Sequence, residues 1–352
     1  MTMQTFPPRV MNSMNLFGKN LDKEIVVVAE LGINHGGSLN WIKEMLVELK
    51  DCGATAVKFQ LFTPDLYSSR SNTKRHQFLQ NVFISKNDFL QIMSFADNLS
   101  LPIFATPLSH DWVDFVAENC GVIKIASGDF TFEATVKAAL TSNAKVIAST
   151  GAASVDEIMN FLKIARSLRV NVEDTVALLH CIAAYPPPLT EANLRSIPFL
   201  RELTNLEIGF SCHFMQDAPL YASLALGAKI FEIHITDDRK RTDIRDHELS
   251  RTPSELGVII ENLNAVNESL RQNIRVVQPT ELEIVNVIRK GIVYCRDLPS
   301  GHVLTSKDLD FARPLDLRIP DIDSVLGQRL RRSVSAYHSV SPQDFSELVQ
   351  EV

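Results

Sequence analysis

The chain has 352 residues, of which 45% are hydrophobic and 22% are charged, and its formal net charge is −7 at pH 7. This length exceeds the usual size of one domain and indicates one large unit plus a small one. A negative charge without a basic stripe argues against nucleic acid or an anionic membrane as a partner. Any anion that binds must therefore be held by local positive charge.

The cysteines indicate a reducing compartment. They are odd in number, widely spaced and form no CxxC pair: Cys52, Cys120, Cys181, Cys212 and Cys295. This pattern is typical of reduced thiols in a cytoplasm. No apolar stretch reaches the roughly 20 residues that span a bilayer, and residues 1–20 lack the apolar core of a secretory signal. We therefore expect a cytoplasmic protein.

Eight short apolar runs follow one another along the chain, and each ends in polar residues at the same relative place. The runs cover residues 25–29, 56–57, 103–105, 122–123, 146–148, 176–179, 208–210 and 230–231. The polar residues that follow them are Glu30, Lys58 with Gln60, Thr106, Lys124 with Ser127, Ser149, His180, Ser211 with His213, and Glu232 with His234. A barrel of eight parallel strands places all strand C-termini on one face, so these side chains would meet in one pocket. The pattern predicts an enzyme.

Segments with helical periodicity separate the apolar runs. Ser154 with Glu157, for example, forms the capping-box signal that opens a helix. Strands and helices that alternate in this way predict parallel βα units, and eight of them close into a (βα)8 TIM barrel. An open doubly wound sheet is the alternative. It would normally carry a glycine-rich dinucleotide loop after its first strand, and the glycines found there do not fit that spacing.

The pattern of the sequence changes after about residue 272: the alternation of strands and helices ends, and short β-type runs are broken by turns. We therefore expect four parts: an N-terminal extension over residues 1–23, the barrel over 24–272, a linker over 273–288 and a small β-rich module over 289–352. A module of about 60 residues is too small to be very stable alone.

Two lysines lie inside the expected strands. Lys58 and Lys124 are each flanked by apolar residues, and a buried ammonium needs a partner. Ser127, Ser149 and Ser211 close three of the strands, where each alone would be read as a turn former. Together with the two lysines they predict an anion site. An internal ion pair is the alternative reading of each lysine.

Two histidines close the last two strands. His213 and His234 have no local metal-binding spacing, but adjacent strands lie about 4.8 Å apart, so the two imidazoles can share one ion. Polar histidines satisfied by hydrogen bonds are the alternative. Glu232 precedes His234 by two residues and so lies on the same face, where it can orient a ligand or a bound water. We expect His180 to be hydrogen-bonded within the barrel.

Several motifs occur in a fixed order along the chain. They are residues 29–37 (AELGINHGG), 57–60 (VKFQ), 124–128 (KIASG), 149–151 (STG), 179–181 (LHC) with Tyr185-Pro186, and 209–211 (GFS) with His213. These motifs resemble the sialic acid synthase (N-acetylneuraminate synthase) family, including its pseudaminic and legionaminic acid branches. The resemblance runs from about Glu24 to the C-terminus, and the last module is similar to the antifreeze-like (SAF) domain of that family.

The resemblance implies a reaction. Phosphoenolpyruvate would condense with an N-acylated mannosamine-type sugar, an N-acyl hexosamine, to give a nine-carbon 2-keto acid and phosphate with C–O cleavage. A divalent metal ion, Mn²⁺ or Mg²⁺, would assist, and the enzyme would be a domain-swapped homodimer without nucleic acid or membrane partners.

The resemblance also implies residue roles. Phosphoenolpyruvate would be held by Lys58, Lys124, Ser127, Ser149 and Ser211, and the metal ion by His213 and His234. The sugar would be faced by Glu30, Gln60, Tyr185, Asp246 and, from the small domain of the neighbouring subunit, Arg313. Glu30, Lys58, Lys124 and His234 would be the catalytic set, with Glu30 handling a proton.

Three parts of the sequence depart from the family pattern. Ile182 and Ala183 replace a polar pair, Cys212 replaces an aspartate expected to orient the site, and residues 240–245 replace a Pro-Gly-Pro approach. A related acceptor such as a 2,4-diacetamido-6-deoxyhexose therefore stays open. So does a pseudoenzyme that binds a sugar or phosphorylated ligand, against which the retained lysines and histidines argue. A binding or ice-binding role of the small domain is disfavoured by its many charged residues.

Overall fold

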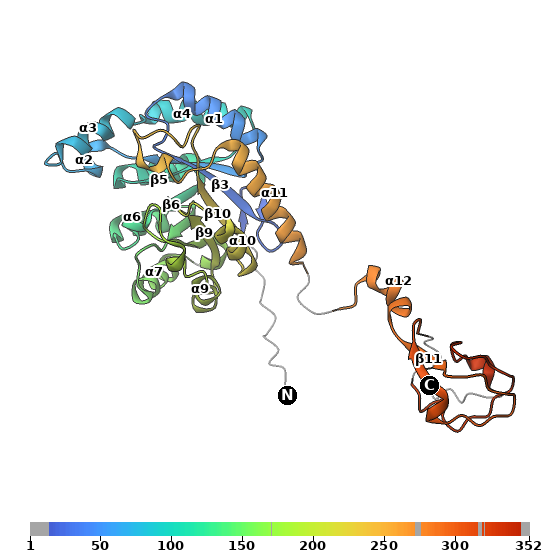
Figure 1. Ribbon diagram of the computed structural model, residues 1–352. Helices are drawn as coiled ribbons and strands as arrows, with labels where there is room; N and C mark the ends of the chain where they lie inside the picture. Colours follow the sequence, from blue (N-terminus) through green and yellow to red (C-terminus); the bar gives the residue numbers. More distant parts are fainter. Residues whose placement is uncertain (1–13, 170, 272–275, 316–318, 320, 346–352) are drawn as a thin grey trace. The chain divides into compact units, whose positions relative to one another are not determined.

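The computed structural model describes residues 14–169, 171–271, 276–315, 319 and 321–345. The chain divides into two compact units, Met1–Arg271 and Gln272–Val352, which are described separately (Figure 1).

The first unit is a closed barrel of eight parallel strands. The strands are β3 (Val26–Gly32), β4 (Ala56–Leu61), β5 (Ile103–Pro107), β6 (Val122–Ile125), β7 (Lys145–Ser149), β8 (Val176–His180), β9 (Glu207–Cys212) and β10 (Ile230–His234). They follow one another around the barrel in sequence order, and β10 closes it by pairing with β3. The prediction of a TIM barrel from the eight apolar runs is confirmed.

Helices surround the barrel, as Figure 1 shows. They are α1 (Leu39–Asp51), α4 (Lys86–Asn98), α5 (Val113–Cys120), α6 (Glu133–Thr141), α7 (Val155–Leu168), α8 (Val172–Thr175), α9 (Ser196–Thr204), α10 (Ala218–Ala225) and α11 (Pro253–Ser269). Two more, α2 (Pro64–Tyr67) and α3 (Thr73–Val82), lie in the β4–α4 connection. The capping box of Ser154 and Glu157 opens α7, as predicted. Within the described residues, no helix has the length and apolar character to cross a bilayer.

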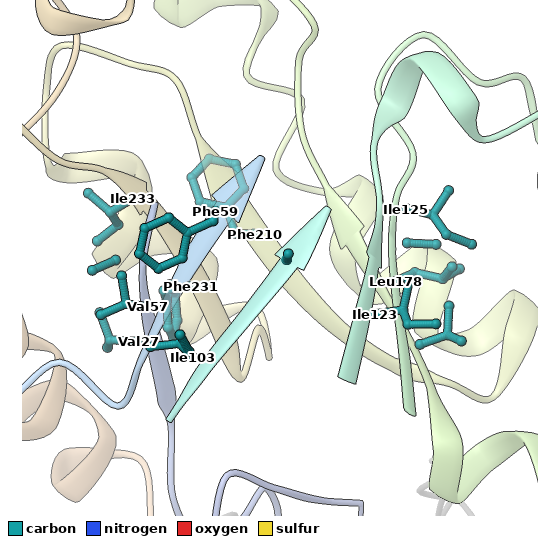
Figure 2. Close-up of a cluster of buried hydrophobic side chains, with 14 of the residues drawn as sticks. Val27, Val57, Phe59, Ile103, Ile123, Ile125, Leu178, Phe210, Phe231 and Ile233 are labelled. Atoms are coloured by element: carbon teal, nitrogen blue, oxygen red, sulfur yellow. The ribbon is translucent and has the colours of Figure 1, made fainter. Parts of the chain in front are cut away.

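Alternate strand residues build two apolar layers. Val27, Val57 and Phe59 point outward against the helices and belong to the large core drawn in Figure 2. A fully buried side chain of this kind contributes roughly 1.5–3 kcal/mol. Residues of the opposite parity, such as Val28 and Phe104, fill the lower barrel interior.

A hairpin packs against the lower interior of the barrel. Its strands are β1 (Asn15–Leu16) and β2 (Lys19–Asn20), which pair antiparallel. Met14, Leu16 and Leu21 are buried in the same cluster as the inward residues of the strands. The N-terminal end of the barrel is therefore apolar and packed, and polar side chains gather at the other end.

The second unit is small and loop-rich. Helix α12 (Pro279–Ile288) precedes β11 (Gly291–Tyr294), which pairs antiparallel with β12 (Leu309–Ala312). Elsewhere in this unit, Val303 with Arg329 and Leu298 with Val334 form isolated bridges. The segment 273–288, interpreted from the sequence as a linker, holds helix α12; its first residues, 273–275, lie outside the described residues.

Two buried aspartates brace this unit. Asp308 accepts hydrogen bonds from Arg296 Nε at 3.0 Å and from the Thr305 amide at 2.9 Å. Burial opposes ionisation, but the Thr305 hydroxyl, His302 and these two donors hold the pKa of Asp308 well below its usual range. Tyr294 donates its hydroxyl to Asp344 at 2.9 Å. Buried charged hydrogen bonds thus add to a modest apolar core.

Candidate active site

A pocket of about 630 Å³ opens at the C-terminal ends of the barrel strands. All the predicted site residues that belong to the barrel line it: Glu30, Lys58, Gln60, Lys124, Ser127, Ser149, Tyr185, Ser211, His213, His234 and Asp246. Arg313 lies in the second unit, where its Nε donates to the carbonyl oxygen of Ile288 at 2.5 Å. Eight strands that are distant in sequence thus converge on one polar site.

Strand register explains why these side chains share one layer. Glu30 pairs with Lys58 on β4 and with His234 on β10, while Glu232 pairs with Ser211 on β9. Residues that pair in register between parallel strands have side chains on the same face. Because these positions have inward parity, their polar groups point into the barrel above the apolar lower layer.

Four buried charges form the floor of the pocket. Lys58 Nζ lies 2.9 Å from Glu30 Oε2 and 3.5 Å from Glu232 Oε2, and Lys124 Nζ lies 3.7 Å from that same Glu232 oxygen. Lys58 also donates to Thr106 Oγ1 at 2.9 Å, and Lys124 donates to Ser149 Oγ at 2.6 Å. The two lysines are therefore paired with carboxylates and also face the pocket.

The surroundings shift the pKa values of Lys58 and Lys124 in opposite directions. Burial tends to lower the pKa of Lys58, but Glu232 and Glu30 together raise it above its ordinary value. The pKa of Lys124 is lowered, because burial outweighs Glu232 and the neighbouring Lys58 repels a second charge. Burial opposes ionisation of Glu232, yet Lys124 and Lys58 lower its pKa to about 2. Glu232 is consequently an anion shared between two cations.

The histidines that end β9 and β10 face each other with ring centroids 5.3 Å apart. His213 Nδ1 donates to the carbonyl oxygen of Ile182 at 2.8 Å, so its Nε2 carries the lone pair. This Nε2 lies 3.5 Å from Ser211 Oγ, whose proton goes to Glu232, so the lone pair can still ligate an ion. The Tyr185 ring stacks on His213 at 4.2 Å. Burial, assisted by His234, lowers the pKa of His213 to about 3, so this imidazole is neutral at pH 7.

The histidine pair fits a divalent ion. His234 Nδ1 is buried without a hydrogen-bond partner, and the nearest carboxylate oxygen recorded, Asp246 Oδ2, lies 3.8 Å away. In the described part of the chain, no group of three or more His, Cys, Asp and Glu side chains is arranged to hold a metal. An ion on this pair would therefore take its other ligands from substrate or water.

Close packing surrounds the predicted anion-binding serines. Ser127 Oγ accepts from the Gly151 amide at 3.1 Å and contacts Cys181 Sγ at 3.2 Å. A Cβ on Gly151 would come within 2.6 Å of that hydroxyl, so any other residue would force the Ser127 side chain to move. Ser211 donates to Glu232 Oε1 at 2.9 Å. His180 Nε2 donates to the carbonyl oxygen of Ala192 at 2.8 Å, so it is hydrogen-bonded as expected. It pairs in register with Phe210 of the outer apolar layer and does not line the pocket, so its predicted convergence with the other polar residues is wrong.

The departures at Ile182 and Cys212 lie mostly outside the pocket. Cys212 pairs in register with Ile233, and both pack in the outer apolar layer, so a carboxylate at position 212 would face the helices and not the pocket. Burial raises the pKa of the Cys212 thiol to about 11. Ile182 accepts the hydrogen bond of His213 through its backbone carbonyl oxygen, and any residue at this position would provide that oxygen. Ala183 lines the pocket, and so do Asp243, Ile244 and Arg245 of the departing segment 240–245.

Sequence reasoning missed the outer wall of the pocket. This wall comes from the loops after β3, β5 and β10 and from the β4–α4 connection, and its side chains are Ile33, Tyr67, Arg75, Phe78, Leu108, Ile244 and Arg245. No motif marks Tyr67, Arg75 and Phe78, which come from the β4–α4 connection. The length of the β4–α4 connection could have pointed to the wall. Residues 62–85 form a connection far longer than the usual 2–6 residues or so, and such long connections are commonly functional.

Comparisons with known proteins agree with this architecture. Residues 45–275 match the NeuB family, and residues 289–346 match the SAF domain. An uncharacterised protein of Methanocaldococcus jannaschii is 32% identical over 290 residues, covering 82% of this chain and 84% of that protein. The N,N'-diacetyllegionaminic acid synthase of Campylobacter jejuni is 28% identical and covers 83% of this chain and 91% of its own length.

A solved structure gives the same result. The N-acetylneuraminic acid synthetase of Leptospira borgpetersenii, crystallised with citrate, aligns with a TM-score of 0.69 and 30% identity, over 74% of this chain and 90% of that one. The matched barrel range covers most of the first unit, and the SAF match falls within the second. The chain therefore belongs to the NeuB family and carries a C-terminal SAF domain.

Proposed function

We propose that this protein is a transferase that condenses phosphoenolpyruvate with an N-acylated mannosamine-type sugar to form a nine-carbon 2-keto acid and phosphate. The observation that carries the proposal is one pocket in which two buried lysines and three serines meet next to a pair of buried histidines. The sialic and legionaminic acid synthases among its relatives support the same reaction class.

Phosphoenolpyruvate suits the charged floor of the pocket. Its phosphate and carboxylate need positive partners, and Lys58 and Lys124 supply two buried ammonium groups. When the anion binds, it competes with Glu30 and Glu232 for these ammoniums, while Ser127, Ser149 and Ser211 offer hydroxyl groups to its oxygens. The lysines would thereby fix the face of the enol that attacks the sugar.

His213 and His234 would hold a divalent ion, Mn²⁺ or Mg²⁺, through nitrogens that the protein leaves available. When bound, such an ion polarises the aldehyde oxygen of the open-chain sugar as a Lewis acid. Glu30, Gln60, Tyr185 and Asp246 line the adjoining walls and would orient the sugar.

The reaction balances with the groups present. C3 of phosphoenolpyruvate forms the new C–C bond to the aldehyde carbon, and water adds at C2. The C2–O bond to phosphate then breaks, so the bridging oxygen leaves with the phosphate. Glu30, whose Oε1 accepts from Gln60 at 2.9 Å, is placed to take a proton from the water or to exchange one with the sugar.

The apolar side chains of the outer wall indicate which substituents the acceptor sugar carries. Ile33, Phe78, Leu108 and Ile244 present apolar surface at the pocket, which suits the methyl groups of N-acyl substituents or of a 6-deoxy sugar. A 2,4-diacetamido-6-deoxyhexose therefore belongs in the substrate panel beside N-acetylmannosamine.

We further propose that the active enzyme is a domain-swapped homodimer in which Arg313 reaches the sugar held by the neighbouring subunit. The SAF match and the location of Arg313 in the second unit support this arrangement. The domain limits proposed from the sequence, 24–272 for the barrel and 289–352 for the SAF module, are consistent with it. We place the reaction in the cytoplasm, where five free cysteines stay reduced.

Labelled phosphoenolpyruvate tests the proposal. Purified full-length protein would be incubated with Mn²⁺, phosphoenolpyruvate carrying ¹⁸O in the bridging position, and a panel of N-acyl hexosamines. We expect sugar-dependent phosphate release, the label in phosphate, and a product mass equal to sugar plus phosphoenolpyruvate plus water minus phosphoric acid. No phosphate release with any sugar would favour the pseudoenzyme instead.

A further inference from the structure

A buried arginine joins the loops that follow the two histidine strands. Arg251 is 3% exposed and lies between β10 and α11. Its amide donates to the carbonyl oxygen of His234 at 2.7 Å, and its own carbonyl accepts from the Thr236 amide at 2.9 Å. The main chain of Arg251 therefore extends the sheet beside the end of β10 and fixes the backbone of His234.

The side chain of Arg251 holds the other loop. Its Nη2 donates to the carbonyl oxygens of Phe214 and Met215, both at 3.0 Å, and these residues directly follow His213. Its Nη1 donates to the carbonyl oxygen of Leu249 at 2.7 Å. One residue thus contacts the backbone next to each histidine.

A carboxylate fixes the orientation of the guanidinium. Asp217, at the start of α10, accepts from Nε at 2.9 Å and from Nη2 at 2.8 Å through its Oδ1. Arg251 therefore uses donors on all three of its nitrogens. A lysine could not reproduce this fork, because its single ammonium carries three donors at one point.

We propose that Arg251 is a positioning residue that sets the separation of His213 and His234 and thereby the affinity of this pair for a divalent cation. The inference rests on the proposed function, which places the ion on these histidines. Arg251 acts through the main chain of both loops. Groups that orient metal ligands from behind typically change metal affinity by about 10–100-fold when removed.

Manganese binding in the absence of substrates is the direct test. The free Mn²⁺ signal in electron paramagnetic resonance would be titrated with full-length wild type, His213→Ala, Arg251→Ala and Arg251→Lys. We expect Arg251→Ala to bind Mn²⁺ about 10–100-fold more weakly and Arg251→Lys to recover only part of the loss. Added methylguanidinium should restore affinity to Arg251→Ala, which a general loss of packing would not allow.

Arg169 provides a matched control. Its guanidinium also donates to backbone carbonyls, those of Ala139, Leu140, Ser142 and Ala144, but at the loop before β7, at the opposite end of the barrel. Arg169→Ala should lower thermal stability and leave Mn²⁺ affinity unchanged. A general effect of losing a bracing arginine would weaken Mn²⁺ binding in both variants, and that result would overturn the positioning role.

The outcomes separate the inference from the proposed function. If His213→Ala loses the ion while Arg251→Ala keeps wild-type affinity, the inference is wrong and the metal site stands. If wild type itself binds no Mn²⁺, the metal site fails and the inference falls with it. Should Arg251→Ala not fold, Arg251→Lys carries the comparison, and wild-type affinity in that variant contradicts the inference.

Discussion

Lys124 Nζ and Glu232 Oε2 lie 3.7 Å apart although their strands are on opposite sides of the barrel. The strands β6 and β10 are four places apart in a closed ring of eight. The contact spans the interior, and both side chains are buried. Any ligand that binds between the strands must enter this charge network. The behaviour of these two residues therefore yields the first predictions.

Glu232→Gln should strongly destabilise the barrel. Removing one partner of a buried ion pair typically costs about 3–5 kcal/mol, because the other charges stay buried and less compensated. Chemical denaturation at pH 7 would measure this. Glu133→Gln, which breaks the exposed pair with Lys137, is the control and should change the free energy of unfolding by less than about 1 kcal/mol.

The destabilisation should depend on pH. The pKa of Glu232 is about 2 in the folded protein and 4.5 for an ordinary glutamate, so the unfolded chain binds the proton more readily. The stability that Glu232 supplies is thus complete above pH 4.5 and declines as the pH falls toward 2. The difference between wild type and Glu232→Gln should shrink over that window. A difference that stays constant would contradict the ion-pair account.

Lys124→Ala should weaken binding of phosphoenolpyruvate far more than binding of the sugar. Loss of a charge-assisted hydrogen bond worth roughly 1.5–3 kcal/mol raises KM by about 10- to 150-fold. Initial-rate kinetics with each substrate varied in turn would show the split. Lys137→Ala, an exposed lysine on α6, is the matched control. An unchanged KM for phosphoenolpyruvate would place the anion site elsewhere.

Alkaline pH should reveal the lowered pKa of Lys124. Because the ammonium loses its proton at a lower pH than an ordinary lysine, binding of phosphoenolpyruvate should decline with rising pH before other lysines titrate. Arg stays charged throughout, so Lys124→Arg should remove this decline even where its overall rate is lower. The measurement is kcat/KM for phosphoenolpyruvate across the alkaline range. A decline of equal midpoint in Lys124→Arg would assign the titration to another group.

Activity should require a divalent ion held by His213 and His234. A chelator should abolish turnover and Mn²⁺ should restore it in wild type, whereas the double variant His213→Ala, His234→Ala should stay inactive at any Mn²⁺ concentration. Circular dichroism would check that the double variant is folded. Full activity of this variant in excess chelator would sink the proposed metal site.

The active site should be completed between subunits. Removing residues 289–352 should leave a folded barrel that binds phosphoenolpyruvate but turns over no sugar. Mixing Arg313→Ala protein with Lys124→Ala protein should restore part of the activity, because each mixed dimer contains one site with both residues intact. If mixed dimers are shown to form and no activity returns, Arg313 acts within its own chain or not at all.

The sequence predicted the barrel and most of its pocket because both depend on short-range patterns. Apolar runs of strand length, each closed by polar residues, locate strand ends such as Glu30 and Ser149, and parity then decides which side chains face inward. The same parity rule could have shown that Cys212, next to inward Ser211, faces the helices.

Features that depend on three-dimensional closure could not be predicted. Nothing in the sequence pairs Lys124 with Glu232, because their contact requires the ring to be closed and its diameter to be known. Tyr67 and Arg75 reach the pocket from the short helices α2 and α3, and no sequence motif shows that this connection folds over the pocket. Helix α12 was missed for a different reason: Pro279 and Glu281 are helix-start signals within a segment read as a linker.

The hairpin beneath the barrel has a kinetic consequence. It leaves the upper mouth as the route by which both reactants enter, and Glu232, two residues before His234 on β10, marks a floor deeper than the histidines. In the proposed reaction phosphoenolpyruvate binds at that floor, so it must bind before the sugar, which would cover it. Phosphate remains at the floor after the reaction and can leave only after the nine-carbon 2-keto acid has dissociated. Steady-state patterns should therefore be ordered, with phosphoenolpyruvate first on and phosphate last off.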